Sequence, residues 1–90
     1  MDVLTEKELE KLYKAVANRR RIAIIRHIRS QGSETVGAIA KAIKLSFKST
    51  SRHLQVLVGA GYLAAEQQGL YMYYMLKPQS ETATRITRLL

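Results

Sequence analysis

Residues 35–57, TVGAIAKAIKLSFKSTSRHLQVL, decide the fold of this chain because they place two short helical patterns on either side of a very short turn. The first helix can start at Thr35, and its inward-facing residues recur at helical spacing: Val36, Ile39, Ala40 and Ile43. Only Lys44 and Leu45 separate it from Ser46, which can cap a second helix. Two helices joined by so short a turn must cross steeply. This is the geometry of a helix-turn-helix unit, in which the second helix is the reader.

The second helix of this pair is polar and basic at its N-terminal end and apolar behind it. Two turns collect Lys48, Ser49, Ser51, Arg52 and His53. Short hydroxyl groups suit contacts with base edges and cations suit phosphates, so the asymmetry favours insertion into a nucleic-acid groove. The alternative is a solvated helix face, which is the more common meaning of a charge run.

The residues before this pair predict two more helices. Thr5-Glu6-Lys7-Glu8 matches a capping box, and apolar residues follow it at helical spacing. Asn18 can cap a second helix, whose wide isoleucine stripe stops at Ser30-Gln31-Gly32.

After Gly59 and Gly61 the pattern changes period. Residues 62–66 and 70–76 are rich in aromatic, Leu and Met residues and flank Gln67-Gln68-Gly69, which predicts a two-stranded hairpin. Its tyrosines could stack on single-stranded bases, but hairpin core and cross-strand pairs are the more common role of such residues. Ser80 and Glu81 can then start a last helix.

The charge of the chain is concentrated in its middle. The formal net charge is +8, and residues 11–60 hold eleven Lys and Arg against the single acid Glu34. Such a segment implies a polyanionic partner. No apolar run approaches the roughly 20 residues of a membrane-spanning helix, and no signal peptide is visible, so we expect a cytoplasmic protein with no membrane partner.

Nothing in the sequence indicates an enzyme. Ser51 and His53 could be a nucleophile and a base, but residues two apart on a helix point to different faces, and no acid follows nearby to orient the imidazole. The chain has no cysteine and two histidines in separate predicted helices, whereas a transition-metal site normally needs three or four ligands. We therefore expect neither a metal nor another cofactor.

Taken together, the order of elements and several motifs resemble the ArsR family of winged helix-turn-helix repressors. The resemblance rests on Ala17-Asn18-Arg19-Arg20-Arg21-Ile22, on Leu45-Ser46 followed by Thr50-Ser51-Arg52-His53-Leu54, on Gly61-Tyr62-Leu63, and on Gly69-Leu70-Tyr71-Met72-Tyr73-Tyr74. It implies a homodimer built on the first and last helices. It also implies a two-fold symmetric operator, often released when an effector binds.

Four features depart from the family pattern. Thr35-Val36-Gly37 stands where many members carry a Cys-x-Cys metal pair, and the last helix has Glu81 but no histidine. Lys44 occupies a turn position that usually holds glycine, so we expect a small left-handed backbone cost there and an added charge near DNA. Leu70 replaces a position at the wing tip that is often basic, which predicts a weaker grip on the minor groove.

We therefore predict a mainly α chain with a small β-hairpin, a winged helix-turn-helix of about five helices and a two-stranded wing. Residues 1–90 form one domain, with dimerisation helices at 5–17 and 80–90, the helix-turn-helix at 35–60 and the wing at 62–76. The predicted function is a sequence-specific transcriptional regulator, a repressor acting as a homodimer on a palindromic site in double-stranded DNA, with no effector assigned. The alternatives are an architectural or non-specific DNA-binding protein and a winged-helix module for protein interaction.

The predicted site residues fall into two groups. Those expected to contact DNA are Lys44, Ser46, Phe47, Lys48, Ser49, Ser51, Arg52, His53, Gln67, Gln68, Arg19 and Arg20. Those expected to form the dimer interface are Leu9, Leu12, Tyr13, Val16, Ile86, Leu89 and Leu90, because exposed apolar faces of that extent are rarely left bare.

Overall fold

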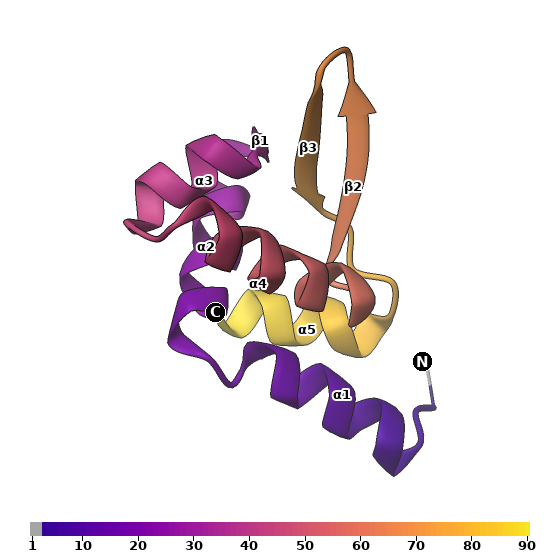
Figure 1. The fold of residues 1–90 in the computed structure, drawn as a ribbon. Helices are drawn as coiled ribbons and strands as arrows, with labels where there is room; N and C mark the ends of the chain where they lie inside the picture. Colours follow the sequence, from indigo (N-terminus) through magenta and orange to yellow (C-terminus); the bar gives the residue numbers. More distant parts are fainter. Residues whose placement is uncertain (1–2) are drawn as a thin grey trace.

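The structure, a computed structural model, describes residues 3–90 as a cluster of helices from which a hairpin projects (Figure 1). The elements are α1 (Glu6–Val16), α2 (Arg19–Gln31), β1 (Ser33–Thr35), α3 (Val36–Ile43), α4 (Phe47–Gly59), β2 (Leu63–Gln68), β3 (Tyr71–Leu76) and α5 (Glu81–Leu89). This confirms the mainly α fold with a hairpin wing. No helix among residues 3–90 combines the length and the apolar character that crossing a membrane requires.

The helices begin at the caps that the sequence predicts. Thr5 and Glu8 form a reciprocal capping box at α1, with hydrogen bonds of 3.0 and 3.1 Å. The Asn18 side chain accepts hydrogen bonds from the backbone N–H groups of two residues in the first turn of α2. Ser46 and Ser80 cap α4 and α5 in the same way. Each cap satisfies N–H groups that a helix start would otherwise leave without a partner.

The core lies around α2, which contacts α1, α3, α4 and β3. Three of its four isoleucines, Ile24, Ile25 and Ile28, are fully buried. Tyr62, also fully buried, donates a hydrogen bond from its hydroxyl to the carbonyl of Leu12 in α1 at 2.9 Å. Burial, with a smaller effect of Tyr13, raises the pKa of Tyr62 to about 12. The residue thus joins the end of α4 to α1 as a neutral donor.

The sheet has three strands, not the predicted two. Its order is β1-β3-β2, and the short strand β1 pairs antiparallel with β3, placing Ser33 opposite Met75 and Thr35 opposite Tyr73. Three residues are too few to show an alternating pattern in the sequence, and this strand is defined by its pairing with a distant segment.

The hairpin turn is also shorter than predicted. Gln67 and Gln68 belong to β2 and lie opposite Met72 and Tyr71, so only Gly69 and the next residue connect the strands. Gly69 has a φ of +63°, the left-handed conformation that two-residue hairpin turns require. Of the three tyrosines in β3, Tyr74 is buried and Tyr73 half-buried, whereas Tyr71 is exposed.

The terminal helices expose less apolar surface than the sequence suggests. Leu12, Val16 and Ile86 are buried in the core of the chain itself, so the prediction that they form an exposed face is wrong. Tyr13 and Leu89 remain exposed, at 56% and 84% of their surface. Leu9 and Leu90 are half-buried.

Two arginines of α2 explain how α5 is held on the core. Arg26 donates from Nε to the carbonyl of Leu90 at 2.5 Å, and Arg29 donates from Nη1 to the carbonyl of Thr87 at 2.7 Å. These carbonyls lie at the C-terminal end of α5, where helical partners are missing and the helix dipole favours cations. Both arginines thus serve the fold of the chain.

Candidate nucleic-acid interface

The turn between α3 and α4 fixes the direction of α4. Lys44 has φ 56° and ψ 51°, the left-handed conformation expected from the sequence, and its N–H closes the end of α3 on Ala40 and Lys41. A non-glycine residue there carries a cost of about 1 kcal/mol. Lys44 and Ser46 are both exposed at this turn.

The outer face of α4 carries a continuous set of polar and exposed residues. A shallow groove along it is lined by Phe47, Lys48, Ser51, Arg52 and Gln55. Phe47 is 63% exposed although it is aromatic. The opposite side of α4 is buried in the core, so the helix is amphipathic, with its polar side free to contact a partner.

The groove on α4 includes Gln55, which was not among the predicted DNA contacts, and does not include Ser49, which was. Gln55 was not singled out from the sequence, although it follows Ser51 by four residues and therefore shares its face. Ser49 and Ser51 are both half-buried, but only Ser51 lines the groove. The geometry therefore favours Ser51 and Gln55 over Ser49 as residues that face a partner.

The His53 side chain contacts another helix of the chain, whereas the sequence predicted that it contacts DNA. Its Nδ1 lies 3.1 Å from Nη1 of Arg21 in α2. Because a guanidinium can only donate, Nδ1 accepts and the neutral ring carries its proton on Nε2. Burial lowers the pKa of His53, and the positive charges of Arg21, Arg20 and Arg52 lower it further. Any contact of His53 with a phosphate would thus be a hydrogen bond from a neutral ring.

Arg21 connects three helices, a role that the sequence did not reveal. Besides His53, its guanidinium donates to the carbonyl of Ala15 at 2.6 Å and to that of Lys14 at 3.3 Å, both in the last turn of α1. One side chain of α2 therefore joins α1 to α4. The only sequence signal was its place in a run of arginines at a helix N-terminus, where the helix dipole disfavours cations.

The other two arginines of this run are exposed. Arg20 and Arg52 both act electrostatically on His53, which places Arg20 near the middle of α4. Arg19 and Arg20 also line a groove against Ala42 and Ile43 of α3. The cations of α2 and α4 therefore lie near each other around the helix-turn-helix unit.

The wing offers amide groups and no cation. Glu66 is the only charged residue in 62–76. Gln67 and Gln68 are exposed on β2, and the Gln67 side chain donates to the carbonyl of Gly69 at 3.3 Å. Leu70 at the tip is 92% exposed.

Residues 3–90 contain no group of three or more potential metal-ligating side chains. His27 instead pairs with Glu34, with 2.5 Å between Nε2 and Oε2, and this pair connects α2 to β1. The residues present therefore give a metal too few ligands.

Comparisons with known proteins agree with this geometry. Residues 18–65 match the family model described as "Bacterial regulatory protein, arsR family". The chain is 33% identical over 69 residues to the HTH-type transcriptional regulator Rv0324 of Mycobacterium tuberculosis, an alignment that spans 77% of this chain and 30% of that relative. The chain thus corresponds to about a third of the length of this relative.

Solved structures show the same fold. One is the homodimeric winged helix-turn-helix DNA-binding domain Mb0332 of Mycobacterium bovis, described as a possible ArsR-family regulator. Its TM-score is 0.80 at 28% identity, over 99% of this chain and 85% of that one. Another is reduced HlyU of Vibrio cholerae, with a TM-score of 0.79 at 26% identity over 93% and 85% of the two chains. The transcriptional repressor PagR of Bacillus anthracis matches with a TM-score of 0.77 at 25% identity over 92% of each chain.

The family match covers more than half of the chain and includes the whole helix-turn-helix unit, and the fold is that of its structural relatives. The chain therefore belongs to the ArsR family, a family of winged helix-turn-helix, DNA-binding transcriptional regulators that are not enzymes.

Proposed function

We propose that this chain acts as a homodimeric, sequence-specific repressor of transcription on a palindromic operator in double-stranded DNA. The observation that carries this proposal is the outer face of α4, where polar and aromatic side chains, all exposed except the half-buried Ser51, form one surface beside exposed cations. A helix with this distribution fits the major groove, which is wide enough to admit it.

The side chains divide into two roles by their chemistry. Ser51 and Gln55 can form hydrogen bonds with base edges, and Phe47 can pack on the methyl group of thymine. Five exposed cations suit phosphates and orient the helix: Arg19, Arg20, Lys44, Lys48 and Arg52. Ser46 near the turn and the two glutamines of β2 can add uncharged hydrogen bonds to the backbone.

The number of available cations is lower than the net charge suggests. Arg21, Arg26 and Arg29 donate to carbonyl groups within the chain, so they serve the fold. If the five exposed cations each neutralise a phosphate, a dimer makes about ten contacts. The logarithm of the affinity should then fall by about nine for each tenfold increase in salt.

The proposed dimer uses Tyr13 of α1 and Leu89 of α5, with the half-buried Leu9 and Leu90 beside them. Large exposed apolar side chains on both terminal helices favour association. The homodimeric description of the Mb0332 domain supports the proposed dimer, and the description of PagR as a transcriptional repressor supports the proposed repressor role. A two-fold dimer presents its two reading helices to two symmetric half-sites, which gives the palindrome.

Selection of bound sequences from a random DNA pool tests this proposal. The selected site is then compared with a scrambled duplex by fluorescence anisotropy at 150 mM salt. We expect an inverted repeat and an affinity ratio of about 1,000 or more. Equal affinities would instead indicate an architectural, non-specific DNA-binding protein. A lack of binding would indicate a protein-interaction module.

A further inference from the structure

A groove between α1 and α4 has an apolar floor that the described part of the chain does not cover. The floor consists of Ala15 from α1 and of Val56, Gly59 and Ala60 from the end of α4. Val56 is 41% exposed although it is aliphatic. The groove has a volume of about 510 Å³, which lies within the range of pockets that hold small molecules.

The rim of this groove is strongly cationic. Lys7, Lys11 and Lys14 follow one another at helical spacing along one face of α1, and Arg21 adds a fourth positive charge. The only acid in the lining is Glu10, which pairs with Lys14 at 3.8 Å. The rim therefore carries a net charge of +3 around an apolar surface, and this combination complements an anion with an apolar body.

The groove lies apart from the surfaces proposed for DNA and for the dimer. Its residues on α4 come after the DNA-facing set that ends at Gln55. Tyr13 does not line it, because Tyr13 lies two residues from Lys11 and so points to the opposite side of α1. A ligand could therefore reach the groove in the proposed dimer.

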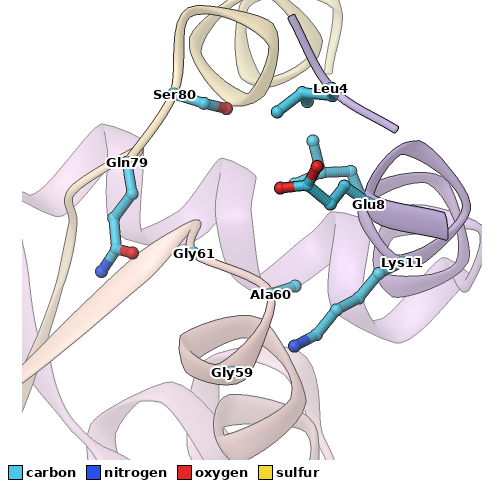
Figure 2. Close-up of a pocket in the computed structure, with 9 residues that line it drawn as sticks. Leu4, Glu8, Lys11, Gly59, Ala60, Gly61, Gln79 and Ser80 are labelled. Atoms are coloured by element: carbon cyan, nitrogen blue, oxygen red, sulfur yellow. The ribbon is translucent and has the colours of Figure 1, made fainter. Parts of the chain in front are cut away.

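A neighbouring hollow lacks the net positive charge of this groove. Figure 2 shows it with the Glu8 carboxylate facing Leu4 and Ser80, and with Lys11 extending from α1 toward Gly59 and Ala60. The carboxylate of Glu8 offsets the charge of Lys11 there. The groove between α1 and α4, on the other side of Lys11, therefore differs from this hollow in its charge.

We propose that the groove between α1 and α4 binds a small anionic amphiphile, a molecule with an apolar body and a carboxylate or sulfonate head. The body covers Ala15, Val56 and Gly59, and the head lies among the ammonium groups of Lys7 and Lys11. A DNA backbone fits this site less well, because phosphates gain nothing from an apolar floor.

Arg21 connects the bound ligand to α4, the proposed reading helix. It lines the groove and also contacts His53 of α4 and the last carbonyls of α1. An anion that attracts this guanidinium competes with those contacts, so the ligand weakens DNA binding and DNA weakens ligand binding by the same factor. This coupling rests on the proposed function, whereas binding of the ligand does not.

The first experiment measures binding of 1-anilinonaphthalene-8-sulfonate to the whole chain by its fluorescence. N-phenyl-1-naphthylamine, which has the same rings without the sulfonate, is the control for charge. We expect saturable binding of one sulfonate probe per chain, and weaker binding of the neutral probe. Replacing Lys7 and Lys11 by Gln should weaken sulfonate binding about two- to fivefold for each lysine removed.

Gly59→Leu provides a variant that fills the groove. A Cβ at Gly59 meets no atom within 4 Å, and leucine is a better helix former than glycine, so the fold should persist. We expect at least tenfold weaker binding of the sulfonate probe. Gly37→Leu is the matched control, because Gly37 is equally open but lies in α3 outside the groove, and it should bind the probe normally. Equal affinities in Gly59→Leu and wild type would overturn the site.

The second experiment measures the affinity for the selected DNA with and without saturating sulfonate probe. We expect at least threefold weaker DNA binding in wild type and no change in Gly59→Leu. An equal response of the two proteins would overturn the coupling through the groove. If no DNA is bound at all, the proposed function fails, and the probe titration still decides whether the ligand site exists.

Discussion

Replacing Arg21 by alanine tests whether one side chain holds the reading helix α4 in place. The guanidinium donates to Ala15 at 2.6 Å, to Lys14 at 3.3 Å and to His53 at 3.1 Å. The first two acceptors are carbonyls at the end of α1, which have no further helical partner there. The change therefore removes three contacts that join three helices.

The expected effect on stability follows from these contacts. Hydrogen bonds from a charged donor contribute about 1.5–3 kcal/mol each when well formed, but Arg21 is only half-buried and its bond to Lys14 is long. Counting one well-formed hydrogen bond and two weak ones, we expect the free energy of unfolding to fall by about 2–3 kcal/mol. Removing a positive charge from the N-terminus of α2 raises the free energy of unfolding by about 0.5 kcal/mol. The net loss of about 2 kcal/mol should lower the Tm of a chain this size by roughly 8–16 °C.

Arg20→Ala is the matched control. Arg20 stands in the same helical turn and carries the same cost from the helix dipole, but its guanidinium has no hydrogen bond to another residue within 3–90. Urea unfolding followed by circular dichroism, at one fixed protein concentration, should show a change within about 0.5 kcal/mol for this variant.

A second readout separates the contact with His53 from a general loss of packing. Burial is the main cause of the lowered pKa of His53, and the charge of Arg21 is the next. In Arg21→Ala the pKa should therefore rise toward the ordinary value, and more than in Arg20→Ala, which NMR titration of the imidazole measures. Equal losses of stability in the two variants, with an unchanged pKa of His53, would refute the role assigned to Arg21.

Four further outcomes are expected. Arg52→Ala should weaken binding to all sequences nearly alike and reduce the salt slope of the dimer by about two units, measured by anisotropy from 50 to 200 mM salt; an unchanged slope would exclude a phosphate contact. Ser51→Ala should cost about 1–3 kcal/mol on the selected operator and little on random DNA, so an unchanged ratio of the two affinities would contradict base reading. Leu89→Glu should shift sedimentation toward the monomer at micromolar concentration, whereas Leu70→Glu, equally exposed at the wing tip, should not; a dimer in both would place the interface elsewhere. The folded pKa of His53 lies below its unfolded value of 6.5, so the contribution of His53 to the free energy of unfolding is complete above pH 6.5 and is lost as pH falls through 6.5 toward the folded pKa. The urea midpoint of His53→Gln should therefore fall less between pH 7.5 and 5.5 than that of the wild type. Equal falls in the two proteins would contradict the pKa shift.

The sequence by itself determined the helices, their caps and the turn of the helix-turn-helix unit. Thr5, Asn18, Ser46 and Ser80 each act on backbone groups two or three residues away, so the signal and the structure that it causes lie in the same short segment. The left-handed conformation of Lys44 was expected from the family resemblance, because this turn position usually holds glycine.

Only the tertiary structure decided features that depend on segments distant in the sequence. The strand Ser33–Thr35 exists because β3, about forty residues later, pairs with it. Arg21 gained its role when α1 and α4 came together around its side chain.

The burial of the terminal helices is another feature that the sequence could not predict. Their periodicity identified an apolar face but could not say what covers it, and the chain's own core covers Leu12, Val16 and Ile86 while Tyr13 and Leu89 stay exposed. Periodicity describes one helix at a time, whereas burial depends on how all the helices pack together, and that packing exists only in the folded chain.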